Sequence, residues 1–122
     1  MNRIERIANR VVASKLAASH PLQVGDIFYS SWGYDQTNID FYQVTAVGEK
    51  SVKIREIEGK RVGGSQGTDD MVAEPNHFKG PEMIKMVKPS QYSGFVLKIN
   101  SYAYARPWDG KPKSQTAMGY GH

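Results

Sequence analysis

Side chains suited to recognising a planar ligand are concentrated between residues 29 and 42. Five aromatic residues alternate there with Ser, Asp, Gln, Asn and Thr: Tyr29, Trp32, Tyr34, Phe41 and Tyr42. Aromatic rings stack on bases, and neighbouring polar groups supply directional hydrogen bonds. Because Phe41 and Tyr42 lie in a strand pattern where one should face a core, we expect Trp32, Tyr34 and Gln36 to bind ligand. The alternative is that the aromatics fill a small core and the polar residues form turns.

A second stretch, residues 100–111, has the same character. Tyr102 and Tyr104 share one face of an extended chain, and Arg106 and Trp108 are again two residues apart. Arginine beside aromatic rings suits phosphate or carboxylate recognition with stacking. Alternatively, Trp108 caps the barrel and Arg106 pairs with a carboxylate. If the first and last strands pair, the two stretches meet in one aromatic pocket.

The basic residues are spread along the chain. Sixteen Lys and Arg residues against twelve Asp and Glu residues give a net charge of +4. With the arginines of the N-terminal segment, lysines such as Lys53, Lys88 and Lys98 could form a phosphate track whose binding depends on salt. The alternative is an ordinary solvated surface in which lysines on edge strands discourage aggregation.

Signatures of catalysis are weak. The chain has no cysteine, which excludes disulfides, a thiol nucleophile and cysteine-ligated zinc. The three histidines are scattered, and residues 63–67 lack the ending of a phosphate-binding P-loop. We therefore predict no catalytic residue, no metal and no cofactor. A hydrolase or nuclease using Asp35, Asp40 or the Asp69 and Asp70 pair remains the third alternative.

The length of 122 residues corresponds to one domain, with a composition typical of globular proteins. No apolar run approaches the ~18 residues of a membrane span, so no membrane contact is expected. Residues 1–20 predict an N-terminal amphipathic helix, with Ile4, Ile7 and Val11 on one face and Pro21 ending it. An arginine-rich start of this kind is also found in mitochondrial targeting segments.

Residues 22–112 predict a single β domain. Strand patterns occur near residues 27–29, 39–47, 51–57, 83–87 and 94–99. The glycines and prolines of residues 58–82 predict a long loop, and residues 113–122 a flexible tail. The expected fold is mainly β, a small SH3-like antiparallel barrel of about five strands with the N-terminal helix. An open antiparallel sheet with the helix on one face is the alternative.

Two segments resemble known groups of proteins. Residues 25–44, together with residues 108–112, resemble a group of small phage and mobile-element proteins of unassigned activity. This resemblance implies a cytoplasmic accessory protein, made in a bacterial host, that binds DNA or RNA or blunts host defence. Residues 24–27 also resemble the opening strand of PemK/MazF-type endoribonuclease toxins. The Arg-Pro pair at Arg106 lies near the opposite end of the chain with no hydrophobic strand after it, so no catalytic role is carried over.

The leading hypothesis is a non-enzymatic module that binds a nucleic acid or nucleotide through the aromatic and polar residues of both stretches. Those residues are Trp32, Tyr34, Gln36, Tyr102, Tyr104, Arg106 and Trp108. The second hypothesis is an anti-defence inhibitor of a host protein complex, in which the same aromatics are interface hot spots. Exposed edge strands would also permit a homodimer.

Overall fold

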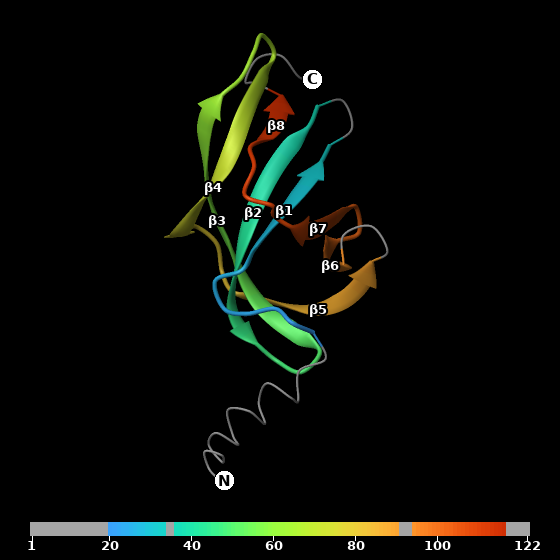
Figure 1. Ribbon diagram of the computed structural model, residues 1–122. Helices are drawn as coiled ribbons and strands as arrows, with labels where there is room; N and C mark the ends of the chain where they lie inside the picture. The colour runs from blue at the N-terminus through green and yellow to red at the C-terminus, as the bar shows by residue number, and fades with distance from the viewer. Residues whose placement is uncertain (1–19, 34–35, 91–93, 117–122) are drawn as a thin grey trace.

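The chain folds into strands that form one antiparallel sheet (Figure 1). The structure is a computed structural model that describes residues 20–33, 36–90 and 94–116. The eight strands are β1 (Ile27–Trp32), β2 (Asn38–Val47), β3 (Ser51–Gly63), β4 (Thr68–Phe78), β5 (Met83–Ser90), β6 (Gly94–Asn100), β7 (Ala103–Pro107) and β8 (Lys113–Thr116). The described residues contain no helix. The mainly β prediction is therefore confirmed.

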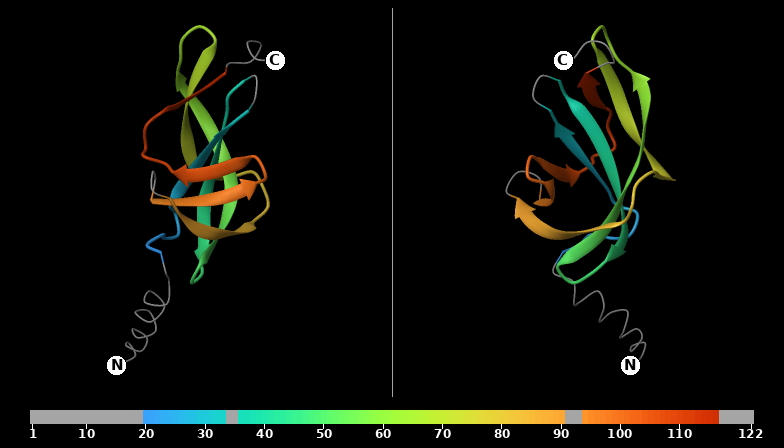
Figure 2. Two further views of the ribbon diagram at one scale, coloured as in Figure 1. Left: turned by 90° about the vertical axis from the view of Figure 1, so that its right-hand side faces the viewer. Right: turned by 180° about the vertical axis from the view of Figure 1, so that it is seen from behind.

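The strand order is β2-β1-β7-β6-β5-β3-β4-β8, and an additional β2–β3 pairing closes six of these strands into a ring. Figure 2 shows β5, β6 and β7 side by side, crossing the direction of β1, β2 and β3. The distal half of β3 leaves the ring and pairs with β4, which in turn pairs with β8. The expected barrel of about five strands is therefore too simple, because two strands extend the sheet beyond the ring.

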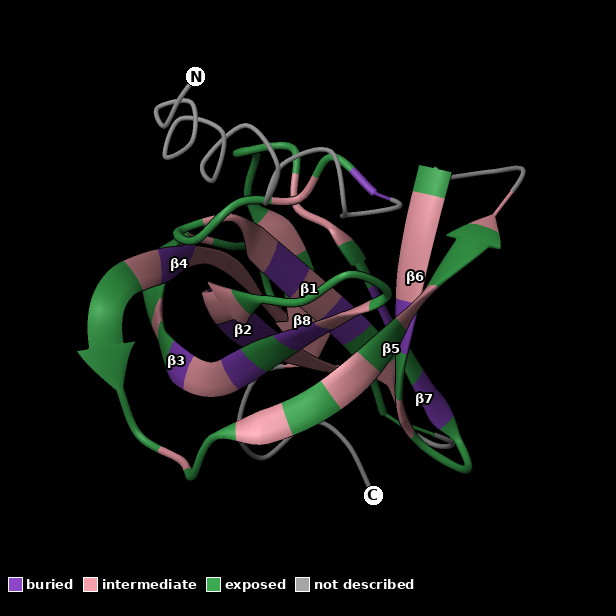
Figure 3. Cartoon of the chain, turned by 90° about the horizontal axis from the view of Figure 1, so that it is seen from below, coloured by how far each residue is buried: buried purple, intermediate pink, exposed green. Residues whose placement is uncertain are grey.

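Strand alternation divides the apolar side chains between two cores, one inside the ring and one outside it. The inner core contains Phe28, Val44, Ile54 and Leu97, all fully buried. The outer core lies on the opposite face of β1 and β2. It is built around Phe41, Ile57 and Ala73, with half-buried residues of β1, β4 and the β7–β8 connection packed against it. Buried residues appear along most of the strands in Figure 3.

Residues 58–82 differ from the predicted loop, since the end of β3 and all of β4 lie there. One glycine in this segment allows close packing, and two others form a turn. A Cβ at Gly59 would lie 3.2 Å from the Phe41 ring and 3.3 Å from Met71 Cε. Gly64 and Gly67, with φ values of 144° and 86°, form the tight connection between β3 and β4. The glycine pattern therefore allows a long hairpin.

Both ends of the described chain are tied to the ring. His20 is buried, with its Nε2 3.0 Å from the Gly48 carbonyl oxygen and its Nδ1 accepting the Leu22 N–H. At the other end, β8 occupies part of the predicted tail, and the Thr116 N–H donates to the Thr37 carbonyl at 2.9 Å. The predicted N-terminal helix and residues 117–122 lie outside the described residues. The described residues include no helix long and apolar enough to cross a membrane.

Candidate functional site

The two aromatic stretches meet because β1, at the start of the first stretch, pairs with β7, which lies in the second. Tyr29 is the register partner of Arg106. At the end of β1, the rings of Trp32 and Tyr102 contact each other, with centroids 5.6 Å apart and planes inclined by 57°. The sequence predicted that the two stretches approach each other if the first and last strands pair, and at this point they do so. The other predicted residues lie elsewhere.

Trp32 belongs to an acid–aromatic cluster, which we define as Trp32, Asp40, Tyr42, Glu56 and Tyr102. The Trp32 indole N–H donates to Asp40 Oδ2 at 2.6 Å. Tyr42 and Glu56 are register partners on β2 and β3, and Asp40 is two residues before Tyr42 on the same face of β2. Pairing of the first three strands thus brings two carboxyl groups and aromatic rings together.

Burial and two carboxylates shape the electrostatics of this cluster. Burial raises the pKa of the Tyr42 phenol, and the carboxylates of Asp40 and Glu56 raise it further. Burial also raises the pKa of the Glu56 carboxyl, as does Asp40, whereas Lys79 partly opposes the rise. Burial is the larger cause of both rises, and the neighbouring carboxylates add to it. The cluster therefore suits a cation better than the phosphate that the sequence pattern favoured for this region.

The Ser30 hydroxyl adds an unsatisfied polar group beside this cluster. Ser30 is fully buried, and its Oγ has no hydrogen-bond partner among the described residues. It is the register partner of Asp40, so its side chain lies on the same face of the sheet. A buried hydroxyl without a partner is destabilising by about 1–3 kcal/mol. The described fold therefore leaves one hydrogen-bonding group unused next to Asp40.

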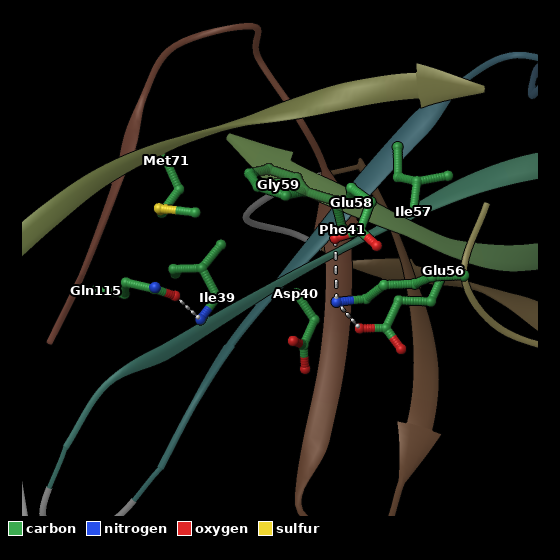
Figure 4. A pocket seen from close by; sticks show the side chains of 10 residues that line it. Ile39, Asp40, Phe41, Glu56, Ile57, Glu58, Gly59, Met71 and Gln115 are labelled. Atoms are coloured by element: carbon green, nitrogen blue, oxygen red, sulfur yellow. Dashed lines mark hydrogen bonds and ion pairs between the residues drawn. The ribbon is translucent and has the colours of Figure 1, made fainter. Parts of the chain in front are cut away.

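A cavity of about 230 Å³ lies next to the cluster, where β2 and β3 separate (Figure 4). Its polar wall includes Asp40, Glu56, Glu58 and Lys79. Lys79 Nζ lies 3.6 Å from Glu56 Oε2 and 3.8 Å from Glu58 Oε1. This one cation therefore forms ion pairs with two of the three carboxylates in the wall. Among the described residues, no three His, Cys, Asp or Glu side chains are placed so that they could hold a metal ion together. The cavity therefore places a further carboxylate, that of Glu58, beside the cluster, but no metal site.

A surface of opposite charge covers the outside of β5, β6 and β7. Lys98 and Tyr104 are register partners, as are Lys88 and Val96. Alternation places Met86 and Arg106 on the same outer face. We call this set the basic face: Met86, Lys88, Val96, Lys98, Tyr104 and Arg106.

The basic face is open and carries only positive charge. The Tyr104 side chain is 43% exposed and Met86 54%. Residues 83–108 contain four Lys and Arg residues and no Asp or Glu. Their charge of +4 equals the net charge of the whole chain, so the acidic and basic residues elsewhere balance. Within the described ranges, Lys88, Lys98 and Arg106 form no ion pair. Their charges are available to an external anion.

The remaining predicted residues take other places. Trp108 packs edge-on against Phe41, with centroids 5.5 Å apart, and its indole N–H donates to the Lys111 carbonyl. It lies against the outer core. Gln36 is exposed, with its Nε2 3.5 Å from Asn38 Oδ1. Tyr34 lies outside the described residues.

Tyr102 and Tyr104 do not lie in one extended segment, which the predicted shared face assumed. Tyr102 lies in the turn that joins β6 to β7, where its N–H donates to Asn100 Oδ1 at 3.1 Å. Extended alternation begins only at Ala103, so it applies to Tyr104 but not to Tyr102. The predicted single pocket is therefore divided between the acid–aromatic cluster and the basic face.

Two residues that matter to this division, Asp40 and Glu56, were not among the predicted binding residues. A signal for them exists, because a hairpin over residues 39–57 places Asp40 and Glu56 near each other once its register is known. Searches of protein-family models, curated proteins and solved structures found no match to this chain.

Proposed function

We propose that this protein is a non-enzymatic module that binds single-stranded nucleic acid on the basic face. The observation that carries the proposal is the absence of any Asp or Glu from residues 83–108. Within this segment Lys98 is the register partner of Tyr104, Arg106 lies two residues further along β7, and Lys88 lies on the same face on β5. Cations without partners in the described structure attract phosphates and release counterions on binding. The exposed tyrosine ring offers a base a stacking surface worth about 1–3 kcal/mol.

The shape of the basic face supports a single strand. It is an open sheet surface, on which successive bases and phosphates can lie across neighbouring strands. The described residues contain no helix that could enter a major groove. The resemblance to phage and mobile-element proteins favours the same function, since such proteins often bind DNA or RNA.

The test is fluorescence anisotropy with a labelled 15-nucleotide oligothymidylate and the full chain. Lys98→Gln and Arg106→Gln should each weaken binding about three- to tenfold, since each removes one phosphate contact. Lys60→Gln is the matched control, because Lys60 is exposed on the distal half of β3, away from the basic face. Equal affinities for Lys98→Gln, Arg106→Gln and Lys60→Gln would contradict the proposal. So would preference for a duplex of the same length.

A further inference from the structure

We propose that the acid–aromatic cluster is a second binding site, which takes a guanidinium group. This site differs from the basic face in the sign of its charge and in its position on the sheet. It is independent of the nucleic-acid proposal. The ligand chemistry follows from the aromatic rings, the carboxylates and the buried hydroxyl that lie together there.

The aromatic rings provide flat surfaces for a planar cation. Tyr102 is 66% exposed and contacts Trp32 at a centroid distance of 5.6 Å, so the two rings form adjoining walls. The Trp32 N–H is already bonded to Asp40, so the ligand would meet the ring surface. A guanidinium group stacks on aromatic faces, whereas a phosphate has no such contact.

The carboxylates provide charge and acceptors. Trp32 binds Asp40 Oδ2, and the described residues give Asp40 no further partner. Glu56 lies on the same face and shares its ion-pair partner Lys79 with Glu58. Asp40 and Glu56 raise the pKa of Tyr42, and Asp40 raises that of Glu56, in addition to the larger effect of burial. Planar guanidinium N–H groups are well matched to a carboxylate edge.

The Ser30 hydroxyl is a separate observation that points to a ligand. Its Oγ is fully buried without a partner among the described residues, and its register partner is Asp40. A guanidinium N–H bonded to Asp40 would have this hydroxyl as a second acceptor. The group could belong to an arginine side chain of a partner protein or to a small free molecule, and both sources share this chemistry.

Trp32 fluorescence tests the proposal directly. The chain has two tryptophans, so Trp108→Phe leaves Trp32 as the only indole reporter. This protein is titrated with Nα-acetyl-arginine amide and with Nα-acetyl-citrulline amide, which has nearly the same shape without the charge. We expect a saturable emission change with the arginine compound and at least tenfold weaker binding of the citrulline compound. Equal responses to both, or no saturable response to either, would overturn the proposal.

Variants locate the effect. Asp40→Asn should weaken binding of the arginine compound about tenfold, and Ser30→Ala should weaken it a few-fold. Asp109→Asn is the control, since Asp109 is an exposed carboxylate paired with Lys113. If Asp40→Asn fails to fold by circular dichroism, Glu56→Gln takes its place with the same expected direction. Binding unchanged in the folded variants would overturn the assignment to this cluster.

A third titration separates the two sources of the guanidinium. Agmatine carries the same group without a peptide backbone. Tighter binding of the capped arginine than of agmatine indicates a protein partner, and the reverse order indicates a small free ligand. Either order supports the guanidinium site, provided that the citrulline compound fails to compete.

Discussion

Gln43 on β2 and Asn76 on β4 are joined by a pair of hydrogen bonds. The Asn76 N–H donates to Gln43 Oε1 at 2.7 Å, and Gln43 Nε2 donates to Asn76 Oδ1 at 2.9 Å. Asn76 has a φ of 69°, which only a few residue types other than glycine adopt. The buried Gln43 amide thus fixes the irregular part of β4 against the ring.

Loss of this amide should destabilise the protein. We expect Gln43→Ala to lower the free energy of unfolding by about 1–2 kcal/mol, because it removes two hydrogen bonds that are partly shielded from water. Urea denaturation followed by circular dichroism measures the change. Gln66→Ala, in the exposed β3–β4 turn, should stay within about 0.5 kcal/mol of the parent. A similarly small effect for Gln43→Ala would show that β4 is held by other contacts.

The two tryptophans should differ in their effect on stability. Trp108→Ala removes a ring packed against fully buried Phe41, and should lower the free energy of unfolding by about 2–4 kcal/mol. Trp32→Ala should have a smaller effect, since Trp32 contacts the exposed Tyr102. Thermal unfolding of both variants gives the comparison. A larger loss for Trp32→Ala would mean that the cluster, rather than the outer core, holds the sheet together.

Gly59 is required by close packing rather than by backbone freedom. A Cβ there would press on Phe41 and Met71 at 3.2–3.3 Å, so Gly59→Ala should cost about 1–3 kcal/mol. Gly63→Ala is the matched control on the same strand, because its Cβ would meet only Asp70 Oδ2, at 3.7 Å. Differential scanning calorimetry resolves the two variants. Equal melting temperatures would show that Phe41 and Met71 adjust without penalty.

Glu56 should make the protein less stable as the pH rises. Its pKa is raised in the fold, so the folded state binds the proton more tightly than the unfolded state does. The corresponding stability is fully present below the ordinary glutamate pKa of 4.5, and is lost as the pH rises from there through the folded pKa. Glu56→Gln should remove this component of the pH dependence.

Urea unfolding at a series of pH values between about 4 and 7 checks this expectation. Glu58→Gln is the control, since Glu58 contacts the same Lys79 but is more exposed than Glu56. We expect the two variants to diverge, with Glu56→Gln gaining stability relative to the parent as the pH rises. Parallel curves for the parent and Glu56→Gln would contradict a disfavoured charge at this position.

Local sequence patterns predicted the central hairpin but not the part of the sheet beyond it. Alternation in residues 51–57 indicated a strand, and β3 begins at Ser51 as expected. Its extension to Gly63 was missed because glycines usually interrupt strands. Here Gly59 is held by the packing of Phe41 and Met71, which a local pattern does not contain. Pairing with β4 and β8 is likewise a long-range effect.

The candidate site was predictable in composition but not in arrangement. The sequence identified Trp32, Tyr102, Tyr104 and Arg106, and the pairing of β1 with β7 does bring the two stretches together. Side chains alternate between the two faces only within a strand, so which face a residue occupies depends on where the preceding turn ends. The turn through Tyr102 separates it from Tyr104, and so separates a negative site from a positive one.

The salt dependence of oligonucleotide binding tests the central claim most directly. We would compare the parent with a Lys88→Gln, Lys98→Gln, Arg106→Gln triple variant across a range of salt concentrations. If these cations contact phosphates, the slope of log affinity against log salt should become shallower by roughly 2 for a single strand. A triple variant with the parent's slope and affinity would contradict nucleic-acid binding at the basic face.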